Sequence, residues 1–310
     1  SRSVDLLVND KQTVLPLFSV GDRGSQGISQ VSAPSTAKNV LAVGTTETGL
    51  LAGSVANISS MGPSLDGRIK PDIVAPGMSI CSGLAEEAKS PAGFSCGTGT
   101  HSDGTPLYMS LSGSSHAASI AGGSTALVRE YLREQVSMNS PSASLIKASI
   151  INGATDLGTP DIPNNVEGWG QINLERTILP TDGSTVLSTF YDDYKPLKAG
   201  FGLLYSFNLD PSHGIDITLA WSDVEGSANA GQGQVRLVND LDLVLVDPNG
   251  QEWLGNDFIN GFTTSGGTPD SVNNVERIKV APGILSTSGQ WLVKVLHRGG
   301  TQQNLSLIHI

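Results

Sequence analysis

Two adjacent serines, Ser114 and Ser115, lie between a glycine and a run of small residues in the segment YMSLSGSSHAASIAGG. If a helix begins here, the N–H groups of its first turn have no partner within the helix, and its dipole favours negative charge. A nucleophilic serine in that position would hold its own amide beside the oxyanion that it creates. The alternative is that one of the two serines only caps the helix.

The elements that would position these serines have the pattern of a parallel α/β sheet. The runs over residues 13–20 and 40–43 predict short buried strands, each followed by a polar or glycine-rich turn. Residues 115–135 predict a helix that begins with small residues and becomes amphipathic, and residues 145–152 predict another. Buried strands that alternate with helices are typical of a parallel sheet covered by helices.

The pattern changes in the second half of the chain, where apolar residues recur with a period of two. Residues 215–221, 240–246 and 291–296 predict strands that follow one another without helices. An antiparallel β-sandwich or jelly roll accounts for such a series. We therefore expect an α/β domain over residues 1–179 and a β-sandwich domain over residues 180–310.

The composition of the chain argues against a nucleic-acid-binding surface and against a membrane-spanning helix. A net charge of −11 and a charged fraction of 15% argue against a nucleic-acid surface, which needs clustered lysine and arginine. No apolar run approaches the ~18 residues of a helix that spans a membrane. Because the chain begins with Ser1 and not with methionine, we expect that a preceding segment has been removed or left out.

The two cysteines of the chain, Cys81 and Cys96, either close a short loop as a disulfide or remain two unpaired thiols. A disulfide is typical of a secreted protein. The N-glycosylation triplets at Asn57 and Asn304 agree with a secretory route, although such triplets often arise by chance. We expect the disulfide and an extracellular location.

The segment around the serines resembles a known motif. Residues 113–117, GSSHA, resemble the Gly-Thr-Ser-Met-Ala motif of subtilases, which opens the buried helix that carries the nucleophile. Residues 17–24, 32–43 and 58–76 resemble successive segments of the subtilase catalytic domain, and Trp169-Gly170 resembles its close. The later segments AWSD, LVNDLDL, LGNDF and NNVE resemble the C-terminal β-domain of certain alkaline subtilases, so the resemblance covers nearly the whole chain.

This resemblance implies a secreted serine endopeptidase of peptidase family S8, which hydrolyses polypeptides through an acyl-enzyme on Ser115. Subtilases carry their catalytic triad in the order Asp, His, Ser, so the aspartate and histidine are expected on an upstream segment of the same protein. By the same resemblance, Ser19, Val20 and Gly21 form an edge of the substrate cleft, and Asp22 occupies the position of the oxyanion-hole asparagine.

Asp22 departs from the family pattern in a way that bears on activity. Asparagine donates an N–H to the oxyanion, whereas an ionised aspartate can only accept. Loss of one oxyanion donor costs on the order of 10²–10³ in turnover. His116 and Ser119 also replace the methionine and proline of the motif. The alternative is therefore an impaired pseudoprotease that serves as a structural or binding module.

Acidic residues in the second half lie near predicted strand ends and turns. Carboxylates with Asn256 and Asn274 nearby could hold Ca²⁺, which prefers oxygen ligands. The alkaline subtilases that the chain resembles bind calcium. The alternative is that these acids cap turns or face water. The expected ligands of a structural Ca²⁺ are Asp223, Asp240, Asp242, Asp257 and Glu276.

Overall fold

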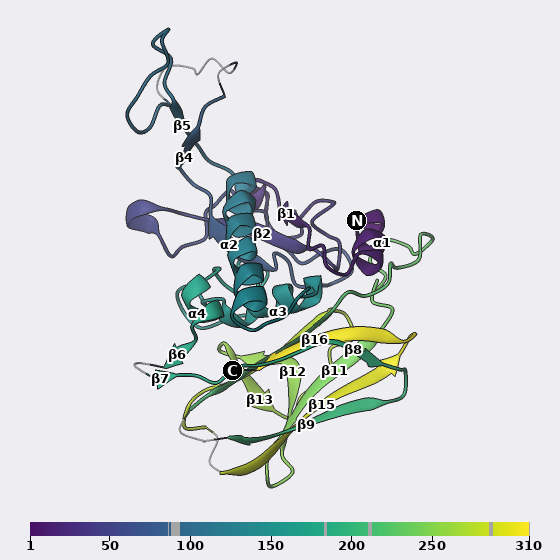
Figure 1. The fold of residues 1–310 in the computed structure, drawn as a ribbon. Helices are drawn as coiled ribbons and strands as arrows, with labels where there is room; N and C mark the ends of the chain where they lie inside the picture. Colours follow the sequence, from purple (N-terminus) through teal and green to yellow (C-terminus); the bar gives the residue numbers. More distant parts are fainter. Residues whose placement is uncertain (86, 88–93, 183–184, 210–212, 285–287, 310) are drawn as a thin grey trace.

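The computed structural model describes residues 1–85, 87, 94–182, 185–209, 213–284 and 288–309. Figure 1 shows an α/β part formed by the first half of the chain and a β part formed by the second. The predicted fold class, a parallel α/β sheet followed by antiparallel sheets, is confirmed. The helices are α1 (Arg2–Asp10), α2 (Ser114–Glu134), α3 (Ala143–Gly153), α4 (Leu174–Ile178) and the 3₁₀ turns η1 (Gly24–Gln26) and η2 (Gly49–Leu51).

The α/β part contains a small parallel sheet of three strands. Its strands lie in the order β1 (Leu17–Ser19), β2 (Leu41–Thr46) and β3 (Ile73–Pro76). Every residue of β2 is buried, as expected for a parallel strand that is covered on both faces. The predicted strand over residues 13–20 is shorter in the structure because Pro16 has no N–H to extend the ladder.

Helix α2 packs against all three strands of this sheet (Figure 1). Its buried stripe follows helical spacing, and the alanines of its first half bring the helix close to the sheet. The stripe consists of Ala117, Ala121, Thr125, Val128 and Leu132. The predicted helix over residues 115–135 is thus confirmed, with its first residue one position earlier.

Helix α3 lies between the two parts of the molecule and is buried along all 11 of its residues. Its start is capped by Ser142, whose Oγ accepts the Leu145 N–H at 2.9 Å. The helix contacts α2 on one side and the β part on the other, where Ala220 and Ile308 join its apolar cluster. Its polar side chains are paired within the protein, since Lys147 forms an ion pair with Asp72 and Asn152 donates to Thr218.

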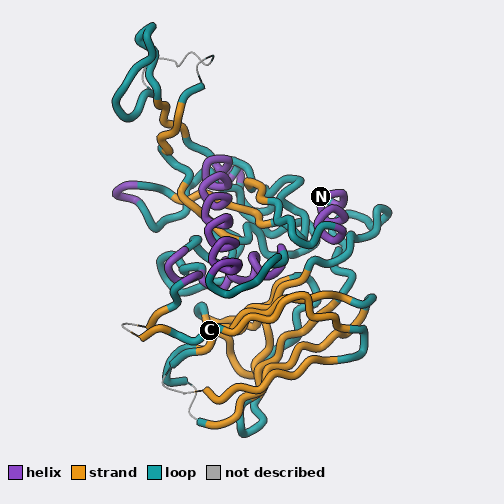
Figure 2. Tube along the Cα trace, viewed as in Figure 1, coloured by secondary structure: helices purple, strands orange, loops and turns teal. Residues whose placement is uncertain are grey.

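Two antiparallel sheets pack face to face in the second half (Figure 2). One has the order β14-β10-β16-β8 and the other β13-β12-β11-β15-β9. Leu219 and Leu305 from the first sheet meet Leu243 and Val293 from the second in one core. The strands are β8 (Phe190–Leu197), β9 (Gly202–Leu209), β10 (Ile215–Trp221), β11 (Asp240–Val246), β12 (Glu252–Ile259), β13 (Phe262–Ser265), β14 (Val275–Val280), β15 (Gly289–Gly299) and β16 (Gln303–His309).

The connection between the two parts contains a short hairpin, β6 (Thr181–Asp182) and β7 (Thr185–Val186), near the predicted boundary at residue 180. The predicted strands over residues 215–221 and 240–246 are β10 and β11, with the same bounds. Their period-two pattern identified them because one face of each strand lies in the sandwich core.

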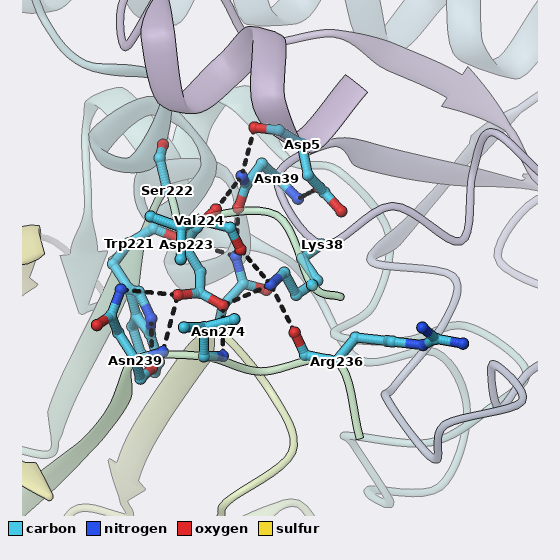
Figure 3. Close-up of polar contacts among 12 residues, drawn as sticks. Asp5, Lys38, Asn39, Trp221, Ser222, Asp223, Val224, Arg236, Asn239 and Asn274 are labelled. Atoms are coloured by element: carbon cyan, nitrogen blue, oxygen red, sulfur yellow. Dashed lines mark hydrogen bonds and ion pairs between the residues drawn. The ribbon is translucent and has the colours of Figure 1, made fainter. Parts of the chain in front are cut away.

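A buried ion pair joins the two parts (Figure 3). The Lys38 ammonium lies 2.5 Å from the Asp223 carboxylate, and both side chains are almost fully buried. The same ammonium donates to the carbonyls of Val224 and Arg236 at 2.6 and 2.7 Å. Asn39, next in the chain, donates to the Asp223 carbonyl. Both buried charges therefore have hydrogen-bond partners, and the ion pair links the α/β part to the β part.

A hairpin arm formed by β4 (Ile80–Gly83) and β5 (Tyr108–Leu111) extends away from the rest of the chain (Figure 1). The structure joins Cys81 and Cys96 in a disulfide, with 5.9 Å between their Cα atoms. The bridge ties β4 to the segment on the other side of β5. No helix in the described ranges is long and apolar enough to cross a membrane.

Candidate active site

The start of α2 is shaped by Gly113, which has a φ of +151°, a value that other residues rarely adopt. A Cβ at this position would lie 3.2 Å from the Asp22 carboxylate. The glycine therefore permits both the turn into the helix and the close approach of Asp22. From here the two serines of the motif take different directions.

Ser114 points into the protein and Ser115 points out. Ser114 is 1% exposed, and its Oγ accepts the Gly21 N–H at 3.2 Å. Ser115 is exposed, and its backbone N–H has no hydrogen-bond partner among the residues that the structure describes. Of the two serines, Ser115 therefore offers a hydroxyl to a ligand, with a free amide beside it at the positive end of a 21-residue helix.

Asp22 lies at the same helix start as Ser115. Its Oδ1 accepts the Ser114 N–H at 2.7 Å. A carboxylate at a helix N-terminus stabilises the helix, typically by about 0.3–1 kcal/mol. An ionised carboxylate in this place can accept a hydrogen bond but cannot donate one to an anion. The structure thus brings Asp22 and Ser115 together.

The predicted cleft residues connect β1 to Asp22. Val20 is fully buried and donates its N–H to the Val43 carbonyl at 3.0 Å. The Ser19 carbonyl accepts from the Ser35 hydroxyl, and the Gly21 carbonyl accepts the Ser60 N–H. These contacts fix the loop that carries Asp22. A role for Ser19, Val20 and Gly21 in binding substrate stays a prediction.

Two of the predicted metal ligands, Asp223 and Asp257, have other partners in the structure, and their role in binding Ca²⁺ stays a prediction. Asp223 uses both carboxylate oxygens within the protein, because Lys38, Val238 and Asn239 all donate to it. Asp257 accepts from the Thr264 hydroxyl at 3.2 Å. Asp223 is therefore the anion of the buried ion pair with Lys38.

The other three predicted ligands keep oxygens that lack a partner. Asp240, Asp242 and Glu276 each have one buried carboxylate oxygen without a hydrogen bond in the described part of the chain. Burial raises the pKa of Glu276 well above its usual range, and the charges of Asp270, Asp242 and Asp240 add to that rise. Burial likewise raises the pKa of Asp240, with Asp242 and Asp270 contributing. These acids repel one another, and a cation would relieve that repulsion.

A further acidic group was not predicted from the sequence. Asp156, Asp161 and Glu167 bring carboxylate oxygens within 4.8 Å of one another, and no other three acids, cysteines or histidines in the described ranges do so. Burial raises the pKa of Glu167 to about 7. Glu167 directly precedes the Gly168-Trp169-Gly170 motif, which is a signal that could have drawn attention to this loop.

The sequence profile described as the subtilase family, peptidase S8, matches residues 2–170. The chain is 35% identical over 242 residues to the serine protease/ABC transporter B family protein tagA of Dictyostelium discoideum, with 72% of this chain and 14% of tagA covered. It is 30% identical over 292 residues to tagB of the same organism, with 74% of this chain and 15% of tagB covered.

Among solved structures, the Prenylagaramide maturation protease PagA aligns with a TM-score of 0.41 and 22% identity. That alignment covers 58% of this chain and 54% of PagA. Compared with the curated relatives tagA and tagB, the matched part of this chain spans about a seventh of their length.

Proposed function

The chain belongs to the subtilase family of serine proteases, and from this premise we propose that Ser115 is the nucleophile of a secreted endopeptidase. The single observation that supports this role most strongly is the contrast between the two serines of the motif. Ser114 is buried and hydrogen-bonded to the loop after β1, whereas Ser115 is exposed beside a free helix N–H.

In the proposed reaction, the Ser115 hydroxyl attacks the carbonyl carbon of a peptide bond and forms an acyl-enzyme. A histidine from the upstream segment takes the hydroxyl proton and passes it to the departing amine. The same histidine then takes a proton from the water that attacks the acyl-enzyme and gives it to the Ser115 oxygen as the new carboxylic acid is released. The Ser115 N–H supplies one donor to the oxyanion in both steps.

The open side of the parallel sheet supports an upstream segment as the partner that carries the aspartate and histidine. Within the described residues, β1 pairs with β2 on one edge only. A groove lies between β1 and α2, and its lining includes Leu17, Gly122 and Ala126. The unpaired edge of β1 presents free N–H and C=O groups, so an additional strand from the same protein would pair there.

The disulfide supports the proposed secreted location. Disulfides persist in oxidising compartments and are rare in the cytosol of mesophiles. The Cys81–Cys96 bridge lies in the exposed arm, where a reducing environment would have free access to it.

The alternative function is a pseudoprotease, and Asp22 is the observation that favours it. Its carboxylate already holds the Ser114 N–H and places negative charge where the reaction creates more. In this alternative the same surface binds polypeptides without cleaving them.

The experiment that tests the proposal measures casein hydrolysis by the full-length protein and two matched variants. Ser115→Ala removes the proposed nucleophile, so activity should fall by at least about 10³-fold. Ser114→Ala removes only a loop contact, so most of the activity should remain. Equal activity of the wild type and Ser115→Ala would contradict the proposal, and no activity in any of the three would favour the pseudoprotease.

We also propose a structural Ca²⁺ in the β part, with ligands among Asp240, Asp242 and Glu276, whose carboxylate oxygens do not all lie within 4.8 Å of one another in the structure. The unpartnered buried oxygens of these acids support it, since Ca²⁺ takes carboxylate oxygens as ligands. The ion would favour the ionised forms of Asp240 and Glu276, whose pKa values burial and the neighbouring acids raise.

A further inference from the structure

The arm is the part of the molecule that the proposed chemistry leaves without a role. It begins four residues after β3, and its second strand β5 ends at Leu111, four positions before Ser115. In Figure 1 the arm rises beyond the N-terminal end of α2, clear of the sheet and of the β part. A substrate bound at Ser115 would therefore lie at the base of the arm.

The register of the arm places two aromatic side chains on one face. Cys81 lies opposite Ser110, and Ser95 lies opposite Met109. Because side chains alternate along a strand, Tyr108 and Phe94 share the face that carries the disulfide. Both aromatic side chains are largely in solvent, with 42% of Tyr108 and 51% of Phe94 exposed. We call Phe94, Tyr108 and the disulfide the aromatic face of the arm.

The backbone limits how far this face lies from the nucleophile. Tyr108 precedes Ser115 by seven residues (115 − 108 = 7), so the two Cα atoms are at most about 25 Å apart. An extended polypeptide advances about 3.3 Å per residue, so about seven substrate residues would cover that distance. A polypeptide of at least that length, bound at Ser115, would therefore reach the aromatic face.

We propose that the aromatic face of the arm is a second binding site for the polypeptide substrate, and this inference rests on the proposed role of Ser115. Phe94 and Tyr108 contact bulky apolar side chains of an extended or unfolded chain, a few residues from the bond that is cleaved. The occupant is assigned from the continuity of β5 with the nucleophile turn, Ser112 to Ser115. The disulfide keeps the two aromatic residues in register on the arm.

The experiment compares long and short substrates in the full-length protein. The variant Phe94→Ser/Tyr108→Ser is matched with Phe201→Ser/Leu204→Ser, which removes two apolar side chains that are 66% and 63% exposed on the β part. The substrates are unfolded casein and a chromogenic tripeptide amide. Labelling of Ser115 by a fluorophosphonate reports the reaction site in every variant.

The arm variant should lose about tenfold in kcat/KM for casein, with the tripeptide rate and the labelling unchanged. The control variant should match the wild type on both substrates. Unchanged casein cleavage by the arm variant would overturn the proposal while the role of Ser115 stands. Loss of labelling and of thermal stability in the arm variant would also overturn it, because the face would then belong to the packing of another segment.

If the wild type cleaves neither substrate, the proposed function fails. The role of the aromatic face is then tested separately, by measuring polypeptide binding. Ser115→Ala and Ser115→Ala with both arm substitutions would each be titrated with fluorescein-labelled unfolded casein. A dissociation constant about tenfold weaker for the arm variant would support the aromatic face as a polypeptide site. Equal dissociation constants would overturn it.

Discussion

The Asp22 carboxylate accepts the backbone N–H of Ser114 at 2.7 Å, one residue before the proposed nucleophile Ser115. This contact stabilises the first turn of α2 and at the same time places a negative charge at the proposed site of the oxyanion. An aspartate at position 22 therefore stabilises the helix but disfavours the proposed catalysis.

Asp22→Asn should raise kcat for peptide hydrolysis by about 10–100-fold at neutral and alkaline pH, because the amide supplies the missing donor. The variant should also lose up to about 1 kcal/mol of unfolding free energy, since the carboxylate no longer complements the helix dipole. Asp22→Ala serves as the control, because it removes the charge without adding a donor. If Asp22→Asn and Asp22→Ala have the same kcat, the account of this position is wrong.

Lys38→Met should destabilise the protein by about 3–5 kcal/mol, because it leaves the Asp223 carboxylate buried without its cation. Arg2→Met is the matched control. It removes an ion pair with Glu225 between the same two parts of the molecule, but the Arg2 side chain is 51% exposed. That change should cost no more than about 1 kcal/mol. Urea unfolding measures both values, and equal losses would contradict the importance of the buried pair.

The sequence predicted the subtilase family, the helix that begins at the GSSHA motif and the strands β10 and β11, because each has a local pattern. The motif glycine, Gly113, needs only its neighbours to be recognised. The partner of Asp223 could not be predicted in this way, since Lys38 lies 185 residues away and nothing in its surroundings marks it. For the same reason, the orientation of the two motif serines became clear only from the packing of Ser114 against Gly21.

The arm and the loop around Glu167 show the same limit. Short strands such as β4 and β5 bury little and have no clear alternation, so their pairing depends on the disulfide and on long-range register. The approach of Asp156 to Glu167 depends on a turn-rich loop whose conformation the residue types do not determine.

Saturating Ca²⁺ should raise the melting temperature of the protein by about 5 °C relative to a chelator, if its concentration exceeds the dissociation constant about 100-fold. Glu276→Gln should abolish this rise, because it removes one charged ligand from the cluster on β11 and β14. Asp257→Asn should leave the rise intact, since Asp257 pairs with Thr264. Differential scanning calorimetry gives the answer, and a wild type that responds to neither calcium nor chelator would contradict the site.

The ion pair between Asp66 and Arg68 should make stability fall in acid. Burial alone would raise the pKa of Asp66, but hydrogen bonds and charge from Arg68, with a bond from Ser64, hold it below 3.8. Because the unfolded state binds the proton more readily, Asp66 stabilises the fold fully above pH 3.8 and loses that effect as the pH falls through its folded pKa.

Asp66→Asn should therefore cost more unfolding free energy at about pH 6 than at about pH 3. Urea titrations of the wild type and the variant at both pH values measure the two differences. A difference that does not shrink in acid would rule out this contribution.

The central claim, that Ser115 is an activated nucleophile, is tested most directly by treating the full-length protein with a fluorophosphonate and mapping the modified residue by mass spectrometry. The account predicts one phosphonylated site at Ser115, which disappears in Ser115→Ala and persists in Ser114→Ala. The absence of labelling in the wild type from about pH 5 to pH 10, or labelling at Ser114, would contradict it.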